Sequence, residues 1–231
     1  MKKQKKDQVK WVNLYSNHID NDFKNWDDYF KTKIKLKKSF LKYVIKYAEK
    51  TKKPILECGC GTGKTSIYLA NIGLKSYAMD IEKEMVCQTL KKYKEMGEKG
   101  FLKVINGDIK NIPFENKFFS VTHSSGVMEH FSDNDIVKII NEQLRVSDFC
   151  IFSVPTSYFE KKMLGNERFM TRKEWRAIIN NSNGIIIKES GYHYKKFKNR
   201  LIDIIKKPKR LLNPIALYTF VIKEEKKIWF I

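Results

Sequence analysis

The stretch that most constrains this chain is residues 54–65, PILECGCGTGKT, in which glycines alternate with other residues. A short apolar run, Ile55 and Leu56, precedes the glycines, and residues 64–72 after them have the pattern of a helix. Glycine reaches positive φ at little cost and lacks the Cβ atom that would keep a ligand away from the backbone. The helix adds unpaired N–H groups at its start. The stretch therefore predicts a strand, a tight turn and a helix that suit a nucleotide-like ligand.

Several kinds of ligand compete for such a turn. A phosphate-binding loop, GxxxxGK[ST], ends correctly at residues 63–65, but Cys58 stands where its first glycine belongs. A dinucleotide fingerprint, GxGxxG, begins correctly, but Lys64 takes the place of its last glycine. Both patterns fail by one residue and are disfavoured. An ordinary glycine-rich turn without a ligand stays open on this stretch alone.

Length and composition fit a single α/β domain with additions, since 231 residues with 42% apolar residues suffice for a sizeable core. The four cysteines lack paired CxxC spacing, so the sequence predicts no metal site, and they suit core or turn positions in a reducing compartment. No stretch approaches the roughly 20 apolar residues of a membrane span, and the first ten residues lack the apolar run of a signal peptide. We therefore expect a cytoplasmic protein.

The net charge is +20, from 46 Lys and Arg against 26 Asp and Glu. Such an excess favours acidic partners, namely nucleic acid, a membrane surface or an anionic substrate. A plain, solvated, lysine-rich surface explains the composition equally well. The charge alone leaves the partner open.

Residues 57–63 have the pattern ExGxGxG, which resembles motif I of the class I S-adenosylmethionine-dependent methyltransferases. The resemblance implies S-adenosylmethionine as the cofactor, with its ribose on Asp80 at the end of the second predicted strand, where a carboxylate can accept both hydroxyls. The run GDIKNIPF from Gly107 resembles the family segment whose acid, here Asp108, bonds the adenine amino group, while Ile109 covers the ring. The implied cofactor-binding residues are Glu57, Gly59, Cys60, Gly61, Gly63, Asp80, Ile81, Asp108, Ile109 and Ser125.

The fourth predicted strand covers residues 119–123, and the segment that follows it indicates one branch of this family. Residues 127–131, VMEHF, resemble the signature of its small-molecule branch, which includes the ubiquinone and menaquinone methyltransferases. Ligands of an open α/β sheet sit beyond the carboxyl ends of the strands, so this segment would face the transferable methyl group. His130 or His123 could act as the general base, since imidazole titrates near neutral pH, and Glu129 could orient the acceptor. Histidines that only pack at the strand end are an equal alternative.

Two further observations concern the family and the acceptor. Ser120 stands where the family usually has a mainly structural Asp. Residues 123–126, HSSG, lack the Asn/Asp-Pro-Pro-aromatic tetrad of amino-methylating nucleic-acid enzymes, and no cysteine lies there to serve as a cytosine C5 nucleophile. The sequence thus favours O- or N-methylation of a small molecule. A nucleic-acid (RNA) methyltransferase, supported only by the charge, and a non-catalytic module that binds the cofactor are the alternatives.

The expected fold is an α/β, Rossmann-like sheet of seven mostly parallel strands, with helices on both faces and an antiparallel last strand. Residues 1–53 would form an N-terminal helical cap, and residues 54–231 the methyltransferase domain. A basic insert near residues 191–214 could be a lid, or could bind a membrane or an anionic substrate. The pattern also predicts helices over 34–48, 82–96 and from 171, and strands over 75–79, 101–105, 149–154, 184–190 and 215–223. Candidate acceptor contacts are Trp11, Tyr15, Tyr158 and Arg168.

Overall fold

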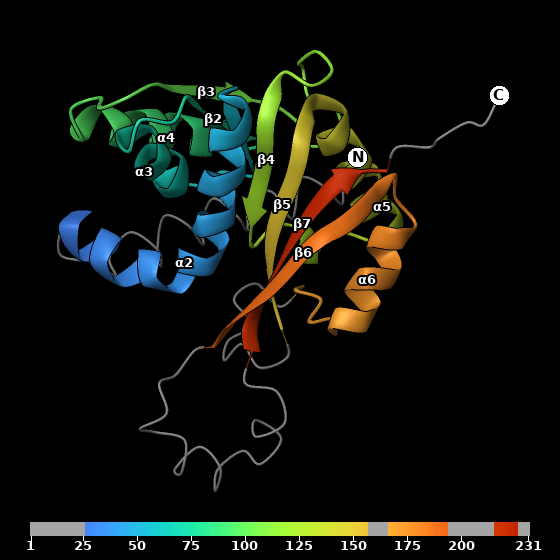
Figure 1. The fold of residues 1–231 in the computed structure, drawn as a ribbon. Coiled ribbons are helices and arrows are strands. Elements are labelled where there is room, and N and C mark those ends of the chain that lie inside the picture. Colours follow the sequence, from blue (N-terminus) through green and yellow to red (C-terminus); the bar gives the residue numbers. More distant parts are fainter. Residues whose placement is uncertain (1–25, 157–165, 194–214, 226–231) are drawn as a thin grey trace, which may run out of the picture.

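The computed structural model describes residues 26–156, 166–193 and 215–225, and the side chains of α2 only from residue 37 (Figure 1). Within these ranges the strands are β1 (Ile55–Cys58), β2 (Ser76–Asp80), β3 (Leu102–Asn106), β4 (Phe119–Ser125), β5 (Ser147–Pro155), β6 (Gly184–His193) and β7 (Ile215–Glu224). The helices are α2 (Trp26–Thr51), α3 (Lys64–Asn71), α4 (Lys83–Glu95), η1 (Met128–His130), α5 (Asp133–Val146) and α6 (Arg172–Asn180).

The strands form one sheet in the order β3-β2-β1-β4-β5-β7-β6. Strands β1 to β5 run parallel, and β7 runs antiparallel to both β5 and β6. This confirms the expected Rossmann-like sheet with an antiparallel last strand. The order reverses between β1 and β4, and ligands of open α/β sheets bind beyond the carboxyl ends of the strands at such a reversal. The topology therefore places a site after β1 and β4.

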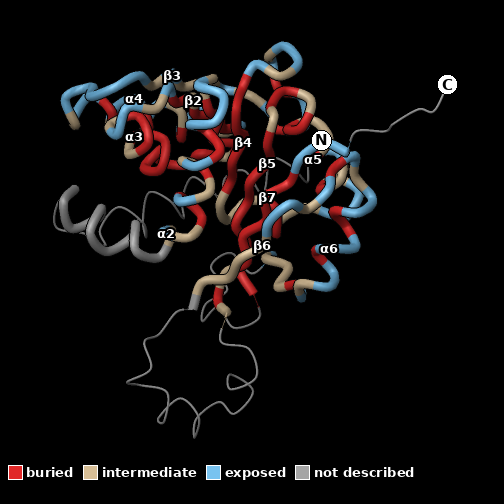
Figure 2. Tube along the Cα trace, in the orientation of Figure 1, coloured by how far each residue is buried: buried red, intermediate tan, exposed pale blue. Residues whose placement is uncertain are grey.

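Helices pack on both faces of the sheet (Figure 1). On one face, α5 and α6 build a core in which Trp175 lies 5.5 Å from Phe152, measured between ring centroids. On the other face, Phe40 and its neighbours on α2 cover β1, β4 and β5. The two cores share β1, because Leu56 belongs to the first and Ile55 to the second. Burial on both faces explains why the central strands read as apolar runs (Figure 2).

The strands agree with the sequence-based expectation to within a few residues, but two differences matter. Strand β4 continues through Ser125, beyond the predicted end at residue 123. Helix α5 had no predicted counterpart, although Ile136 and Ile140 repeat at helical spacing and Ser132 caps the helix by accepting from the Asp135 amide. The basic insert lies almost wholly outside the described residues, and the division at residue 53 stays a prediction. No helix of the described ranges is long and apolar enough to cross a bilayer.

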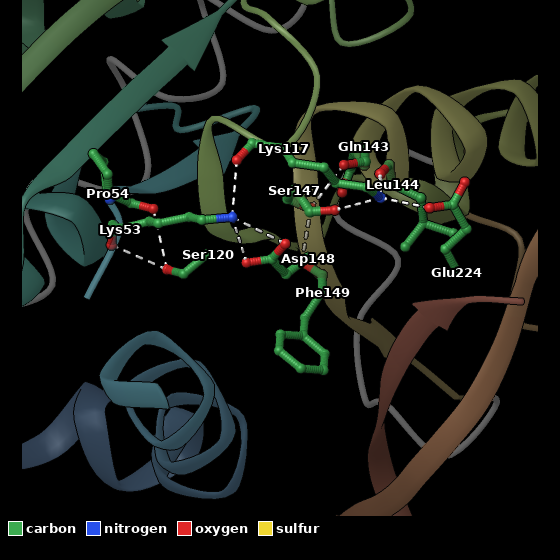
Figure 3. A network of polar contacts seen from close by, with 10 residues as sticks. All are labelled: Lys53, Pro54, Lys117, Ser120, Gln143, Leu144, Ser147, Asp148, Phe149 and Glu224. Carbon is green, nitrogen blue, oxygen red and sulfur yellow. Dashed lines mark hydrogen bonds and ion pairs between the residues drawn. The ribbon is translucent and has the colours of Figure 1, made fainter. Parts of the chain in front are cut away.

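A polar network joins the end of α2 to the amino ends of β4 and β5 (Figure 3). The hydroxyl of fully buried Ser120 donates toward the carbonyl oxygens of Lys53 and Pro54, both at 3.1 Å. The Lys53 ammonium in turn bonds the Asp148 carboxylate at 2.9 and 3.1 Å and the Lys117 carbonyl at 3.0 Å. Carbonyl oxygens attract a hydroxyl and repel a carboxylate. The network thus accounts for serine at a position where the family usually has Asp.

We predict that Ser120→Asp destabilises the fold more than Ser120→Ala does. Alanine removes a net contribution of about 1 kcal/mol. Aspartate would bury a charge against two carbonyl oxygens and should cost more than about 3 kcal/mol. Urea unfolding of both variants measures the difference, and an Asp variant as stable as the wild type would contradict the described network.

Candidate active site

Two neighbouring segments pack closely against the glycine turn between β1 and α3. Gly59, Gly61 and Gly63 have φ angles of 72°, 54° and 69°, which side chains rarely adopt. A Cβ atom on Gly63 would lie 2.1 Å from Cγ2 of Thr89 on α4, and one on Gly59 would lie 2.8 Å from Cγ2 of Val127. Both α4 and the segment after β4 therefore approach the turn as closely as glycine permits.

Asp80, at the end of β2, braces this turn and borders the site. Its Oδ2 accepts from the Gly61 amide at 2.7 Å, and its Oδ1 accepts from the Glu82 amide at 3.0 Å. Burial raises the pKa of the Asp80 carboxyl, and the backbone donors oppose this shift. Each carboxylate oxygen keeps a second lone pair for a ligand hydroxyl. Beside it Ile81 is 55% exposed. A diol acceptor next to an open apolar side chain fits the ribose and adenine of S-adenosylmethionine.

The end of β3 supplies the third part of this edge. Asp108 is exposed and accepts from the Lys110 amide through Oδ1 at 2.8 Å. Ile109 is only 7% exposed and packs in the core, so Ile81 offers the more open apolar surface for a ring. Asn106 donates to the carbonyl oxygens of Asp80 and Ile81, both at 2.9 Å. Sequence reasoning missed Asn106, whose only signal is a polar residue at a strand end.

Glu57 lies beneath the turn, where it anchors the start of α3. Its Oε2 accepts from the Ser66 amide at 2.9 Å and from the Ser66 hydroxyl at 2.5 Å. Burial raises the Glu57 pKa, while the charge of Lys37 and the bonds from Ser66 lower it. Lys37 donates to Thr65 Oγ1 at 3.0 Å, and burial lowers its pKa. Lys37 was not predicted; its signal is a charge on the apolar face of α2, three residues before Phe40.

His123 lies inside the sheet. It is 0% exposed, its ring centroid is 5.9 Å from that of Phe40, and neither ring nitrogen has a partner among the described residues. Burial, aided by the charge of Lys37, lowers the His123 pKa to about 3. The interpretation of His123 as a base is therefore corrected, because β4 extends two residues further than predicted and encloses this side chain.

The Glu129 and His130 pair lies just after β4. Glu129 is 3% exposed, and its Oε2 has no partner within the described part of the chain. Burial raises the Glu129 pKa to about 8, with a smaller contribution from the charge of Glu167. His130 Nδ1 lies 2.9 Å from Asn166 Oδ1, and burial lowers the His130 pKa. At neutral pH the pair thus combines a protonated carboxyl with a neutral imidazole.

Arg168 holds this segment in place. Its amide donates to the Glu129 carbonyl at 3.0 Å, and its guanidinium donates to the Phe131 carbonyl at 2.6 Å and pairs with Asp133. These contacts link the loop before α6 to η1 and the start of α5. Arg168 was expected to contact the acceptor, and the contacts in the structure instead indicate a positioning role.

The remaining predicted residues divide by position. Ser125 ends β4 beside Ser153 of β5, and Cys60 lies in the turn, where burial raises the pKa of its thiol. Trp11, Tyr15 and Tyr158 lie outside the described residues. Among the described side chains, no group of three or more His, Cys, Asp or Glu is placed to hold a metal ion.

The sequence profile described as "Methyltransferase domain" matches residues 55–148, a range that contains the glycine turn, Asp80, Asp108 and the Glu129 and His130 pair. Residues 55–148 thus form a methyltransferase domain. The cofactor of the methyltransferase is therefore S-adenosylmethionine. No curated protein sequence matches the chain significantly.

Solved structures share the fold of this methyltransferase. Magnesium protoporphyrin IX methyltransferase from Synechocystis PCC 6803, with bound S-adenosylmethionine, is 15% identical with a TM-score of 0.62, over 94% of this chain and 90% of that one. An S-adenosylmethionine-dependent methyltransferase from Clostridium acetobutylicum is 14% identical with a TM-score of 0.61, over 94% and 98%. Geranyl diphosphate C-methyltransferase from Streptomyces coelicolor is 8% identical with a TM-score of 0.56, over 75% and 70%.

We predict that Asp80→Ala weakens binding of S-adenosylmethionine by roughly 10- to 100-fold, since hydrogen bonds to a charged group contribute about 1.5–3 kcal/mol. Isothermal titration of the purified chain measures the change. Glu95→Ala, an exposed carboxylate at the end of α4, is the control and should bind as the wild type does. Unchanged affinity in Asp80→Ala would contradict the assignment of this edge to the ribose.

Proposed function

We propose that the methyltransferase transfers the methyl group of S-adenosylmethionine to a hydroxyl or amine of a small-molecule acceptor, with His130 as the general base. The observation that carries the proposal is the contact of His130 Nδ1 with Asn166 Oδ1 at 2.9 Å. With Oδ1 accepting, Nδ1 holds the hydrogen and Nε2 holds the lone pair that a base needs. Burial lowers the His130 pKa, which keeps the imidazole in its basic, neutral form at physiological pH.

The chain supplies position and environment for this step. The cofactor, when bound, provides a methyl group already activated by its sulfonium. The glycine turn and Asp80 would hold the nucleoside, and the segment after β4 would face the methyl group, so alignment contributes much of the rate. Glu129, protonated below a pKa of about 8, can donate a hydrogen bond that orients the acceptor.

Several observations support a small, anionic acceptor. Residues 123–126 lack the tetrad of amino-methylating nucleic-acid enzymes, and two structural neighbours are named for magnesium protoporphyrin IX and geranyl diphosphate. The net charge of +20 favours an anionic group on the acceptor. The four free cysteines agree with a reducing cytoplasm as the site of action.

The function is tested by incubating the chain with isotope-labelled S-adenosylmethionine and the small-molecule fraction of a cell extract. The expected result is a product heavier by one labelled methylene equivalent, together with S-adenosylhomocysteine. Label in a parallel RNA fraction, with none in the small molecules, would overturn the proposed acceptor class. Cofactor binding without any labelled product would favour a non-catalytic module.

Replacement of His130 tests the base. His130→Ala should lower kcat by roughly 10²- to 10⁴-fold, the usual contribution of a general base. The affinity for S-adenosylmethionine should change by less than about threefold, because the assigned cofactor contacts lie on other residues. Turnover on the labelled acceptor and titration with the cofactor give the two values. A variant that keeps its kcat would remove His130 from the proton transfer.

The pH profile separates the two side chains of the pair. As pH rises, the wild-type kcat/KM should increase below pH 6.5, where His130 loses its proton, and decrease above about pH 8, where Glu129 ionises. Glu129→Gln cannot ionise, so it should keep the rise and lose the fall.

Stability provides a second measurement on Glu129. Folding raises its pKa from 4.5 to about 8, so the folded chain binds more protons than the unfolded chain over that interval. The free energy of unfolding of the wild type should therefore decrease across it as pH rises. The stability of Glu129→Gln should lack this pH-dependent decrease. An identical pH dependence in both proteins would show that Glu129 is not the group responsible for it.

A further inference from the structure

Four lysines recur at every fourth position along α2, and their side chains are exposed. We call this set, Lys38, Lys42, Lys46 and Lys50, the lysine ridge. Residues four apart in a helix lie one turn above each other on the same side. At a rise of 1.5 Å per residue, successive charges are about 6 Å apart and the row is about 18 Å long. The ridge is thus a row of regularly spaced positive charges that winds gradually around the helix.

The described residues leave the charge of the ridge uncompensated. Glu49 is the only acidic residue within residues 37–53 of the sequence. None of the ion pairs between described residues includes a ridge lysine. The ammonium groups of Lys46 and Lys50 lie instead 6.0 and 4.9 Å from the ring centroid of Tyr47. Like charges four residues apart repel each other, so the ridge does not serve the stability of α2.

The opposite side of α2 fixes the helix to the domain. Phe40, Leu41, Val44 and Ala48 are buried against β1, β4 and β5. Within residues 37–51, where the side chains of α2 are described, this burial leaves no apolar face that could insert into a bilayer, as an amphipathic membrane helix requires. Lysine is also depleted in protein–protein interfaces. A row of isolated ammonium groups suits the phosphates of a nucleic-acid strand, which lysine binds as a point charge without reading sequence.

We propose that the lysine ridge docks a single nucleic-acid strand through its phosphate backbone. Lys37, next to the first ridge lysine, bonds Thr65 at the start of α3, so the ridge begins at the cofactor edge of the sheet. A docked strand would run from that edge along α2. The net charge of +20 adds long-range attraction to the encounter. Docking of the strand is a function beyond the proposed methyl transfer. It does not depend on which molecule accepts the methyl group.

The test uses the full chain and a short fluorescein-labelled oligouridylate, with polarisation measured over a series of salt concentrations. The ridge variant changes the four ridge lysines to Gln, which keeps a similar helix propensity. The matched control changes four exposed lysines elsewhere to Gln, with the same loss of charge: Lys91, Lys94, Lys99 and Lys173. Thermal unfolding and titration with S-adenosylmethionine accompany both variants.

The ridge variant should bind the oligouridylate at least about tenfold more weakly than the control variant. Its plot of log affinity against log salt should be shallower than that of the wild type by about 3, from four contacts at roughly 0.7 each. Binding of S-adenosylmethionine should stay unchanged, which separates failure of this proposal from failure of the cofactor site.

Equal losses in the ridge and control variants would overturn the proposal, because they would show a response to net charge alone. Retention of the wild type on phosphatidylserine vesicles but not on oligouridylate would overturn it in favour of a membrane surface.

Discussion

The hydrogen bond from the Gly61 amide to the Asp80 carboxylate joins the two strand ends that border the proposed cofactor site. It ties the turn after β1 to the end of β2 and fixes the acid at the mouth of the turn. The positive φ angles of the glycines allow this amide to point at the carboxylate. Asn106 adds to this arrangement, because it donates to the adjacent carbonyl oxygens of Asp80 and Ile81.

Three acidic residues at the sheet show how burial and partners decide the use of one chemical group. Glu57 is buried and accepts from the amide and hydroxyl of Ser66, so it serves as an internal anchor. Asp80 lies nearer the surface and combines backbone donors with space for a ligand. Glu129 is buried without a described partner for Oε2, and its pKa rises to about 8. Desolvation, the supply of donors and the neighbouring charges of Lys37 and Glu167 distinguish these carboxyl groups.

The sequence was sufficient to predict those parts of the candidate site that depend on residues close together in the chain. The glycine turn and the acids after β2 and β3 depend on short spacings, and the structure has each of them at a carboxyl end of the sheet. His123 could not be placed in this way, because alternation does not tell where a buried strand stops. Lys37 and Asn166 lie far along the chain from the groups they contact, so only tertiary packing brings them together.

Helix α2 is held at both ends of residues 37–51, the part whose side chains the structure describes. Lys37 bonds Thr65 at the carboxyl edge of the sheet, and Lys53, just past the helix, bonds Asp148 and the Lys117 carbonyl at the amino edge. Between these points the helix is held by Phe40 and its buried neighbours. Because this part of the helix is held at both ends, it cannot rotate about one of them as a rigid body. Cofactor exchange should therefore leave this part of α2 in place and proceed by movement elsewhere in the chain.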